Sequence, residues 1–192
     1  MDDFAADIDA FMEAVGIDEV TLVGHSSGGL IVQRVALSYP RRVSRLVLIG
    51  SPTTLVNNEA LIELGEEMLA LEDPIPPEFV ESTIHHPVPE EFVAGAVSEC
   101  LKAPARVWRD YWEGVLLAAN DTARLGEIGA PTLILWGKRD ALLPHVEQEL
   151  RAAAIPDATL RVYPETGHAV AGERPEWVVR DLEAFMRGTA PA

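Results

Sequence analysis

Three polar side chains that lie far apart along the chain could together attack a carbonyl group: Ser26, Asp140 and His168. A serine hydroxyl is a weak nucleophile until a base removes its proton, and histidine most often serves as that base near neutral pH. A carboxylate that accepts a hydrogen bond from the imidazole fixes its tautomer and stabilises the imidazolium that forms. If folding brings the three together, their chemistry is acyl transfer through a covalent acyl-enzyme.

Ser26 is the candidate nucleophile because it lies in the sequence GHSSG, which fits G-x-S-x-G. The pattern follows an apolar strand and precedes a helix, where a sharp turn lifts the serine to the carboxyl end of a sheet. We expect larger side chains at Gly24 or Gly28 to collide with the neighbouring elements. The backbone N–H of Ser27 could then donate to a developing oxyanion, aided by the helix N-terminus.

Two other interpretations fit the glycine-rich turn when it is taken alone. It could be a strand-to-helix turn with a capping serine. It could also be a phosphate-binding loop, but both the lysine of a P-loop and the glycine spacing of a dinucleotide site are missing.

His168 is the best candidate base among the five histidines. It lies in a loop just after the last predicted strand, at the carboxyl edge where parallel sheets gather functional loops. The remaining histidines lie beside the serine, in the middle of the chain and at the start of a helix: His25, His85, His86 and His145. The side chain of His25 should point away from Ser26, and we keep it as a candidate substrate contact.

Asp140 lies four residues past the preceding strand, where its carboxylate could accept a hydrogen bond from His168 Nδ1. Taken alone, Asp140 is better explained as a turn or N-cap aspartate, and His168 as a polar loop residue. The order serine, aspartate, histidine, each just after a strand, favours a catalytic triad over three coincidences.

The elements that must position these residues alternate between strand and helix. The first half predicts an amphipathic helix over Asp3–Val15, a strand over Glu19–Val23, a helix over Leu30–Ser38 and a second strand over Val43–Ile49. The last third predicts two strands and two helices, over Leu133–Trp136, His145–Ala153, Ala158–Tyr163 and Pro175–Met186. This alternation predicts an α/β fold with a mostly parallel sheet and flanking helices.

The middle of the chain interrupts this pattern and predicts a helical cap insertion. Strand-like runs vanish, and helices over Ala60–Leu71, Glu90–Leu101 and Ala105–Ala118 alternate with prolines. We therefore expect a core formed by residues 1–52 and 120–192, and a cap segment over residues 53–119. Trp108 and Trp112 are candidate substrate contacts, although aromatic residues at helical spacing are more often core.

No metal or organic cofactor is required by this chemistry. His85 and His86 with the acidic pair Glu90 and Glu91 could suggest a metal site, but the intervening prolines break helical spacing, so we predict none. The formal net charge of −16 disfavours nucleic acid and anionic membrane surfaces as partners. The acidic N-terminus lacks the basic start of a secretory signal, and the single cysteine allows no intrachain disulfide, so a cytoplasmic location is expected.

Three motifs resemble those of the α/β-hydrolase fold family: LVGHSSGG around Ser26, PTLILWGKRDALLP around Asp140 and YPETGHAVAGERPEWV around His168. The resemblance spans nearly all of the chain. It implies that the four strands are the last four of the family's eight and that the cap segment shapes the substrate pocket. It also implies that the family's N-terminal strands, with the His-Gly-type loop that supplies a second oxyanion donor, are missing here.

A partial α/β-hydrolase fold would leave one edge of the sheet open. We expect the open edge to pair with another chain or to form a homo-oligomer. The loss of one oxyanion donor would weaken catalysis by about 10²–10³-fold.

The sequence thus predicts a serine hydrolase of an apolar acyl or ester-like small molecule. The alternative is a truncated fragment, weakly active or inactive, that acts as a binding or oligomerising domain. Within the same class, a cofactor-free haloperoxidase or perhydrolase and a carbon–carbon bond hydrolase could use the same triad.

Overall fold

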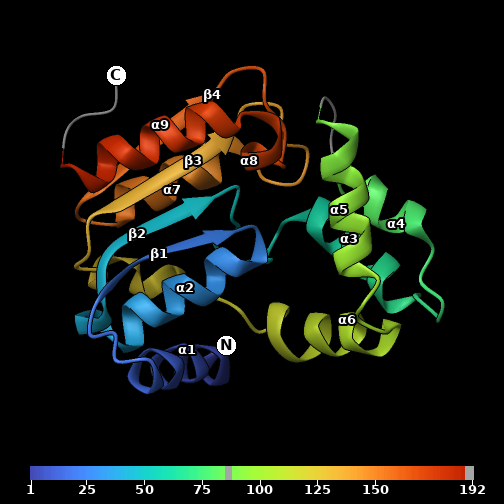
Figure 1. Cartoon of the computed structure of the whole chain (residues 1–192), viewed down its shortest axis with the longest axis horizontal. Helices are drawn as coiled ribbons and strands as arrows, with labels where there is room; N and C mark the ends of the chain where they lie inside the picture. Colours follow the sequence, from blue (N-terminus) through green and yellow to red (C-terminus); the bar gives the residue numbers. More distant parts are fainter. Residues whose placement is uncertain (85–87, 189–192) are drawn as a thin grey trace.

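The computed structural model describes residues 1–84 and 88–188. A four-stranded parallel sheet forms its centre, with the strands in the order β1 (Val20–His25), β2 (Val43–Ile49), β3 (Thr132–Gly137) and β4 (Ala158–Tyr163) (Figure 1). Each strand neighbours the next along the chain, and helices flank the sheet. The predicted α/β fold is therefore confirmed.

The two inner strands are apolar on both faces because helices cover both faces of the sheet. Leu46, Leu48 and Ile134 point to one face, whereas Val47 and Leu133 point to the other, and all five are fully buried. Such continuous apolar runs are typical of parallel sheets.

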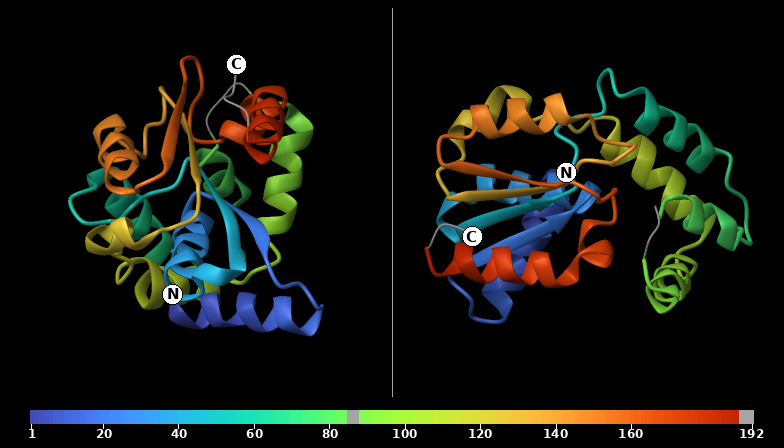
Figure 2. Two further views of the ribbon diagram at one scale, coloured as in Figure 1. Left: turned by 90° about the vertical axis from the view of Figure 1, so that its left-hand side faces the viewer. Right: turned by 90° about the horizontal axis from the view of Figure 1, so that it is seen from above.

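Helices of the two faces come from different parts of the chain. On one face pack α1 (Asp2–Ala14), α2 (Ser27–Ser38) and α7 (His145–Ala154). On the other pack α8 (Val170–Glu173) and α9 (Pro175–Met186). Figure 2 shows α7 and α9 on opposite sides of the sheet.

The edge strand β1 is covered less completely than its neighbours. Val23 pairs in register with Val47, so it points to the face on which α9 lies. Yet 48% of Val23 is exposed, because α9 packs over the other three strands. Within the described residues, the outer edge of β1 pairs with no strand.

The cap segment lies beyond the carboxyl ends of the strands (Figures 1 and 2). It contains α3 (Glu59–Leu69), α4 (Pro77–Ser82), α5 (Glu90–Cys100) and α6 (Ala105–Tyr111). The helical stretch expected over Ala105–Ala118 is present as far as Leu116, but α6 passes into a π-helical turn over Trp112–Leu116. The short helices α4 and α8 were not predicted.

The π-helical turn begins where a large side chain becomes buried. Trp112 packs against Gly65 of α3 so closely that a Cβ on this glycine would lie 1.8 Å from the indole. Contacts of this kind between distant segments leave no periodic signal in the sequence.

No helix among residues 1–84 and 88–188 has both the length and the apolar character needed to cross a bilayer.

Candidate active site

Ser26 lies at the sharp turn between β1 and α2. The strand continues to His25 and the helix begins at Ser27, so the turn is tighter than the predicted bounds of Val23 and Leu30 imply. Ser26 itself adopts a φ of 50°, a region that non-glycine residues rarely occupy. Strain of this kind at one serine, held by a strand and a helix, is the backbone geometry of a nucleophile elbow.

The glycines around the turn differ in what they allow. A Cβ at Gly24 would lie 2.6 Å from the backbone of Gly28 and Gly29, so a larger residue would collide as expected. At Gly28 the expectation is wrong, because a Cβ there would meet nothing within 4 Å. Gly29 is crowded as well, because a Cβ there would lie 2.0 Å from Ser51 Oγ.

Ser51 packs against Gly29 at the start of α2, and side chains of α7 hold Ser51 in place. Its backbone carbonyl accepts hydrogen bonds from Gln148 Nε2 at 3.1 Å and from Arg151 at 2.9 Å. Both side chains are buried, and burial lowers the pKa of Arg151 to about 10, so the guanidinium stays charged at neutral pH. The loop after β2 is thereby fixed against Gly29.

The structure brings Ser26, His168 and Asp140 together in one hydrogen-bonded row. His168 Nε2 lies 2.9 Å from Ser26 Oγ, and His168 Nδ1 lies 2.9 Å from Asp140 Oδ2. Because a carboxylate can only accept, Nδ1 carries the proton and donates to Asp140, which leaves Nε2 free to accept from the serine hydroxyl. The side chains of His168 and Asp140 are 7% and 0% exposed, so little water competes for these bonds.

The second oxygen of Asp140 is also occupied. Asp140 Oδ1 accepts hydrogen bonds from the backbone N–H groups of Leu142, at 2.9 Å, and Leu143, at 3.1 Å. The carboxylate therefore shapes its own turn and orients His168 at the same time. The contacts of Asp140 therefore fit both interpretations drawn from the sequence, a turn aspartate and the carboxylate that orients His168.

Side chains on both sides hold the backbone of the loop that carries His168. The Gly167 N–H donates to the buried carboxylate of Glu173 at 2.8 Å. His25 Nε2 lies 3.2 Å from the His168 carbonyl oxygen, and Gly50, with a φ of 46°, leaves room for that same oxygen. Glu173 was not among the candidate residues, although it belongs to the third motif.

His25 is turned toward the site rather than away from it. Its ring centroid lies 5.4 Å from that of His168, and it lines the same pocket. Desolvation by neighbouring atoms holds the pKa of His25 below its ordinary value, and the His168 ring adds to this shift. A neutral His25 fits a positioning contact beside His168.

A cavity of about 380 Å³ opens over Ser26 and His168. The core contributes its polar end, including Ser27 and His25, while the cap segment contributes mainly apolar side chains. Trp108 and Trp112, the candidate substrate contacts, line this cavity, and both also pack in an apolar cluster with other cap residues. The volume lies in the range of small-molecule sites.

Tyr111 is a pocket residue that sequence reasoning missed. Its phenol forms a hydrogen bond with the side chain of Ser27, the residue that follows the candidate nucleophile. Burial raises the pKa of Tyr111, so the hydroxyl keeps its proton near neutral pH. Its position three residues after Trp108 was the available signal, because residues three apart share a helix face.

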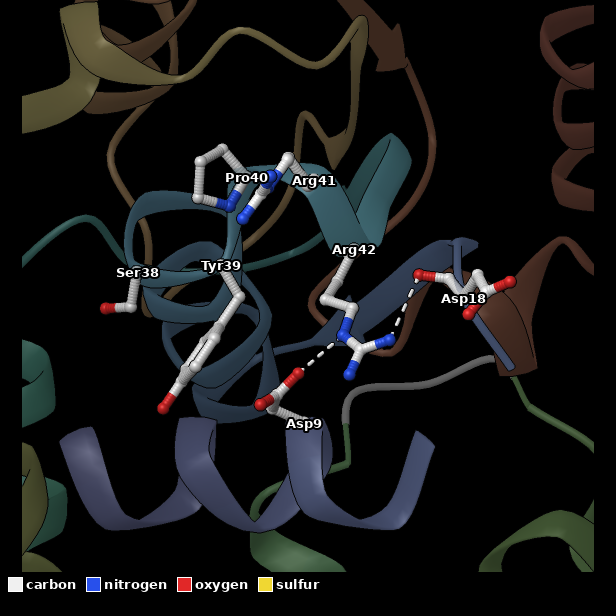
Figure 3. A pocket seen from close by; sticks show the side chains of 7 residues that line it. All are labelled: Asp9, Asp18, Ser38, Tyr39, Pro40, Arg41 and Arg42. Carbon is white, nitrogen blue, oxygen red and sulfur yellow. Dashed lines mark hydrogen bonds and ion pairs between the residues drawn. The ribbon is translucent and has the colours of Figure 1, made fainter. Parts of the chain in front are cut away.

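A second hollow of about 610 Å³ lies between α1 and the start of β2 (Figure 3). Arg42 crosses it and donates to Asp9 at 2.5 Å and to the backbone carbonyl of Asp18 at 3.5 Å. The residues that line it include no nucleophile paired with a base. The candidate chemistry therefore belongs to the cavity over Ser26.

Within the described ranges, no group of three or more histidine, cysteine, aspartate or glutamate side chains is arranged to hold a metal ion. His85 and His86, considered above with Glu90 and Glu91, lie outside the described residues.

Residues 1–181 match the model of the alpha/beta hydrolase family. The chain is 29% identical to 2-hydroxy-6-oxo-6-phenylhexa-2,4-dienoate hydrolase from Burkholderia cepacia, covering 84% of this chain and 60% of that protein. It is 32% identical to a protein described as the carbamate hydrolase RutD from Variovorax paradoxus, covering 98% of this chain and 74% of the relative.

Among solved structures, a thermophilic esterase from Thermogutta terrifontis superposes with a TM-score of 0.79 at 25% identity. The match covers 96% of this chain and 71% of the esterase. The chain spans about 60% of the length of the first curated relatives it matches.

Proposed function

Because the chain belongs to the alpha/beta hydrolase family, we propose that it hydrolyses an ester-like acyl substrate through an acyl-enzyme on Ser26. The observation that carries the proposal is the unbroken row of hydrogen bonds from Asp140 through His168 to Ser26. In this row each atom has the partner that its role in serine hydrolysis requires.

In the first half of the reaction, His168 Nε2 accepts the hydroxyl proton while Ser26 Oγ bonds to the substrate carbonyl carbon. Asp140 stabilises the resulting imidazolium without taking up the proton. The tetrahedral oxyanion accepts a hydrogen bond from the Ser27 N–H at the start of α2, where the helix dipole favours negative charge. The imidazolium then protonates the leaving alcohol as the carbon–oxygen bond breaks.

In the second half, His168 removes a proton from water, and the resulting nucleophile attacks the acyl carbon. Collapse of the second tetrahedral intermediate returns the proton to Ser26 Oγ and releases the acid. The His168 imidazole carries every proton transfer. The nucleophile is the Ser26 hydroxyl in the first half and water in the second.

The composition of the pocket favours an uncharged, apolar acyl group as substrate. Among the described residues that line it there is no arginine or lysine to bind a carboxylate, whereas leucine, methionine and tryptophan side chains are frequent. The carbon–carbon bond hydrolase from Burkholderia cepacia is named for a dienoate, which is an anion. The absence of a cation in the described lining makes an ester the preferred substrate over such a dienoate.

Replacement of Ser26 tests the proposal. We expect Ser26→Ala to lower kcat for p-nitrophenyl butyrate by about 10⁴-fold or more, since Ser26 Oγ is the hydroxyl that pairs with His168 Nε2. Ser38→Ala, at the exposed end of the same helix, is the matched control and should retain full activity. Unchanged turnover in Ser26→Ala would show that another residue is the nucleophile.

Alternative reactions of the same triad are distinguished by product. Peracid formation from acetate and hydrogen peroxide would indicate a perhydrolase of the haloperoxidase type. Cleavage of a vinylogous diketone, with loss of its visible absorbance, would indicate carbon–carbon bond hydrolysis. The ester proposal predicts that p-nitrophenyl butyrate is turned over faster than either.

The open edge of β1 favours a second candidate role, in which the chain pairs with another copy of itself through this edge. Unpaired backbone groups and the exposed Val23 lie together there. Light scattering should then report a dimer, and Val23→Lys should shift it to a monomer. A monomer at all concentrations would contradict this role and leave the hydrolase proposal unaffected.

A further inference from the structure

Tyr111 is the polar side chain by which the cap segment reaches the reacting end of the pocket. It lies at the end of α6 and lines the same cavity as Ser26 and Ser27. Its phenol oxygen and the Ser27 hydroxyl form a hydrogen bond. The phenol therefore lies beside a side chain whose own backbone N–H is the candidate oxyanion donor.

The ring of Tyr111 is held from the core side. Phe4 of α1 meets it edge to face, with ring centroids 6.0 Å apart and planes at 90°. Such a contact orients an aromatic ring without occupying its hydroxyl.

The backbone of Tyr111 is held from the cap side. The next residue, Trp112, is buried against Gly65 and begins the π-helical turn. Single π-helical turns inside helices occur frequently at functional sites, where they redirect a side chain. The helix is thus anchored immediately beside the phenol.

The surroundings favour a hydrogen-bond donor that acts on developing negative charge. Burial raises the pKa of Tyr111, so the hydroxyl stays protonated near neutral pH. The adjoining lining is apolar, and a hydrogen bond to an oxyanion is stronger where water is excluded.

We propose that the Tyr111 hydroxyl donates a hydrogen bond to the oxyanion formed during acyl transfer, beside the bond donated by the Ser27 N–H. The inference rests on the proposed function, since it assigns a role in that same reaction. In the free protein the phenol is paired with the Ser27 hydroxyl, and in the transition state the phenol O–H donates to the oxyanion. No proton is transferred to or from the phenol.

The role differs from a merely structural one in a measurable way. If Tyr111 only orients Ser27, then Ser27→Ala removes the partner and abolishes any further effect of Tyr111→Phe. If Tyr111 acts on the oxyanion, Tyr111→Phe has the same effect with or without the Ser27 hydroxyl, because Ser27→Ala keeps the backbone N–H.

The experiment compares the wild type, Tyr111→Phe, Ser27→Ala and the double variant with p-nitrophenyl butyrate, and measures inhibition by butylboronic acid. We expect Tyr111→Phe to lower kcat by about 10- to 100-fold, with KM changed less than about two-fold, because the bond forms only in the transition state. The boronate, which forms a tetrahedral adduct on serine, should bind weaker by a similar factor. Tyr39→Phe, away from the pocket, is the matched control.

Two results would overturn the inference alone. One is wild-type hydrolysis together with a kcat for Tyr111→Phe within about three-fold of the wild type. The other is an effect of Tyr111→Phe that disappears in the Ser27→Ala background. If the wild type neither hydrolyses the ester nor reacts with a fluorophosphonate, the proposed function fails together with the inference. Melting temperatures of all variants separate misfolding from loss of the hydrogen bond.

Discussion

The two walls of the pocket are built in different ways. The core wall presents Ser26, His168 and the Ser27 N–H, each fixed by a strand end, a helix start or a loop with several backbone hydrogen bonds. The cap wall presents apolar side chains from short helices, with the Tyr111 phenol as its polar group nearest Ser27. We infer that the core wall supplies the chemistry, assisted by Tyr111, and that the apolar side chains of the cap wall supply the fit to the substrate.

The difference extends to how firmly each wall is anchored. The side chain of Asp140 is fully buried in the loop after β3. By contrast, α5 of the cap has no buried residue, and its Phe92 touches the core by packing on Gly172 of α8. Changes in the core wall, and at Tyr111, should therefore alter kcat, and changes at the apolar side chains of the cap wall should mainly alter KM.

The largest effect on the core wall is expected from the loss of the base. His168→Ala should lower kcat by about 10⁴-fold or more, because the Ser26 hydroxyl would have no acceptor for its proton. His145→Ala is the matched control, since His145 stacks on Trp136 away from the cavity. Steady-state kinetics with p-nitrophenyl butyrate measure both, and a loss of less than ten-fold in His168→Ala would contradict its role as base.

A smaller but still large effect is expected at the orienting carboxylate. Asp140→Asn should lower kcat by about 10²- to 10⁴-fold, because an amide cannot hold the tautomer with the proton on His168 Nδ1. The amide oxygen can still accept from Leu142 and Leu143, so the turn should survive. An unchanged melting temperature with unchanged kcat would show that Asp140 only shapes its loop. Asp157→Asn, at an exposed position, is the control.

Substitution at Gly29, which packs against Ser51, should have an intermediate effect. Gly29→Ala places a methyl group 2.0 Å from Ser51 Oγ, so we expect a loss of about 1–3 kcal/mol in the free energy of unfolding. Gly28→Ala meets nothing within 4 Å and should be neutral or slightly stabilising, since alanine favours helix. Urea unfolding of the pair measures the difference, and equal stabilities would contradict the close packing at Gly29.

The smallest effect is expected on the cap wall. Phe92→Ala removes the ring that packs on Gly172 and lines the pocket. We expect KM to rise about three- to ten-fold with kcat nearly unchanged, because the lost contact binds the substrate and the transition state equally well. Leu101→Ala, exposed at the end of α5 and outside the pocket lining, is the control. A fall in kcat with constant KM would show that Phe92 contributes to the chemical step and not to substrate binding.

The core wall could be predicted from the sequence, and the reason is local. Ser26, Asp140 and His168 each follow a strand that the sequence predicts, and parallel strands bring such positions to one edge. The order of the three residues then selects them from among all serines, aspartates and histidines of the chain.

The details of the cap wall could not be predicted in the same way. The break of α6 at Trp112 and the contact of Tyr111 with Ser27 depend on segments that lie far apart in the sequence. The crowding at Gly29 is of the same kind, because its cause is Ser51, which follows a different strand. Periodicity describes one element at a time and carries no information about these contacts.

The account depends most on Ser26 being an activated nucleophile, and intact-protein mass spectrometry after treatment with a fluorophosphonate tests this directly. The wild type should gain one phosphonyl group, mapped to the peptide that carries Ser26, and His168→Ala should react far more slowly. Ser26→Ala should gain none. A folded wild type that stays unmodified, or a Ser26→Ala variant that is labelled as fast as the wild type, would contradict the account.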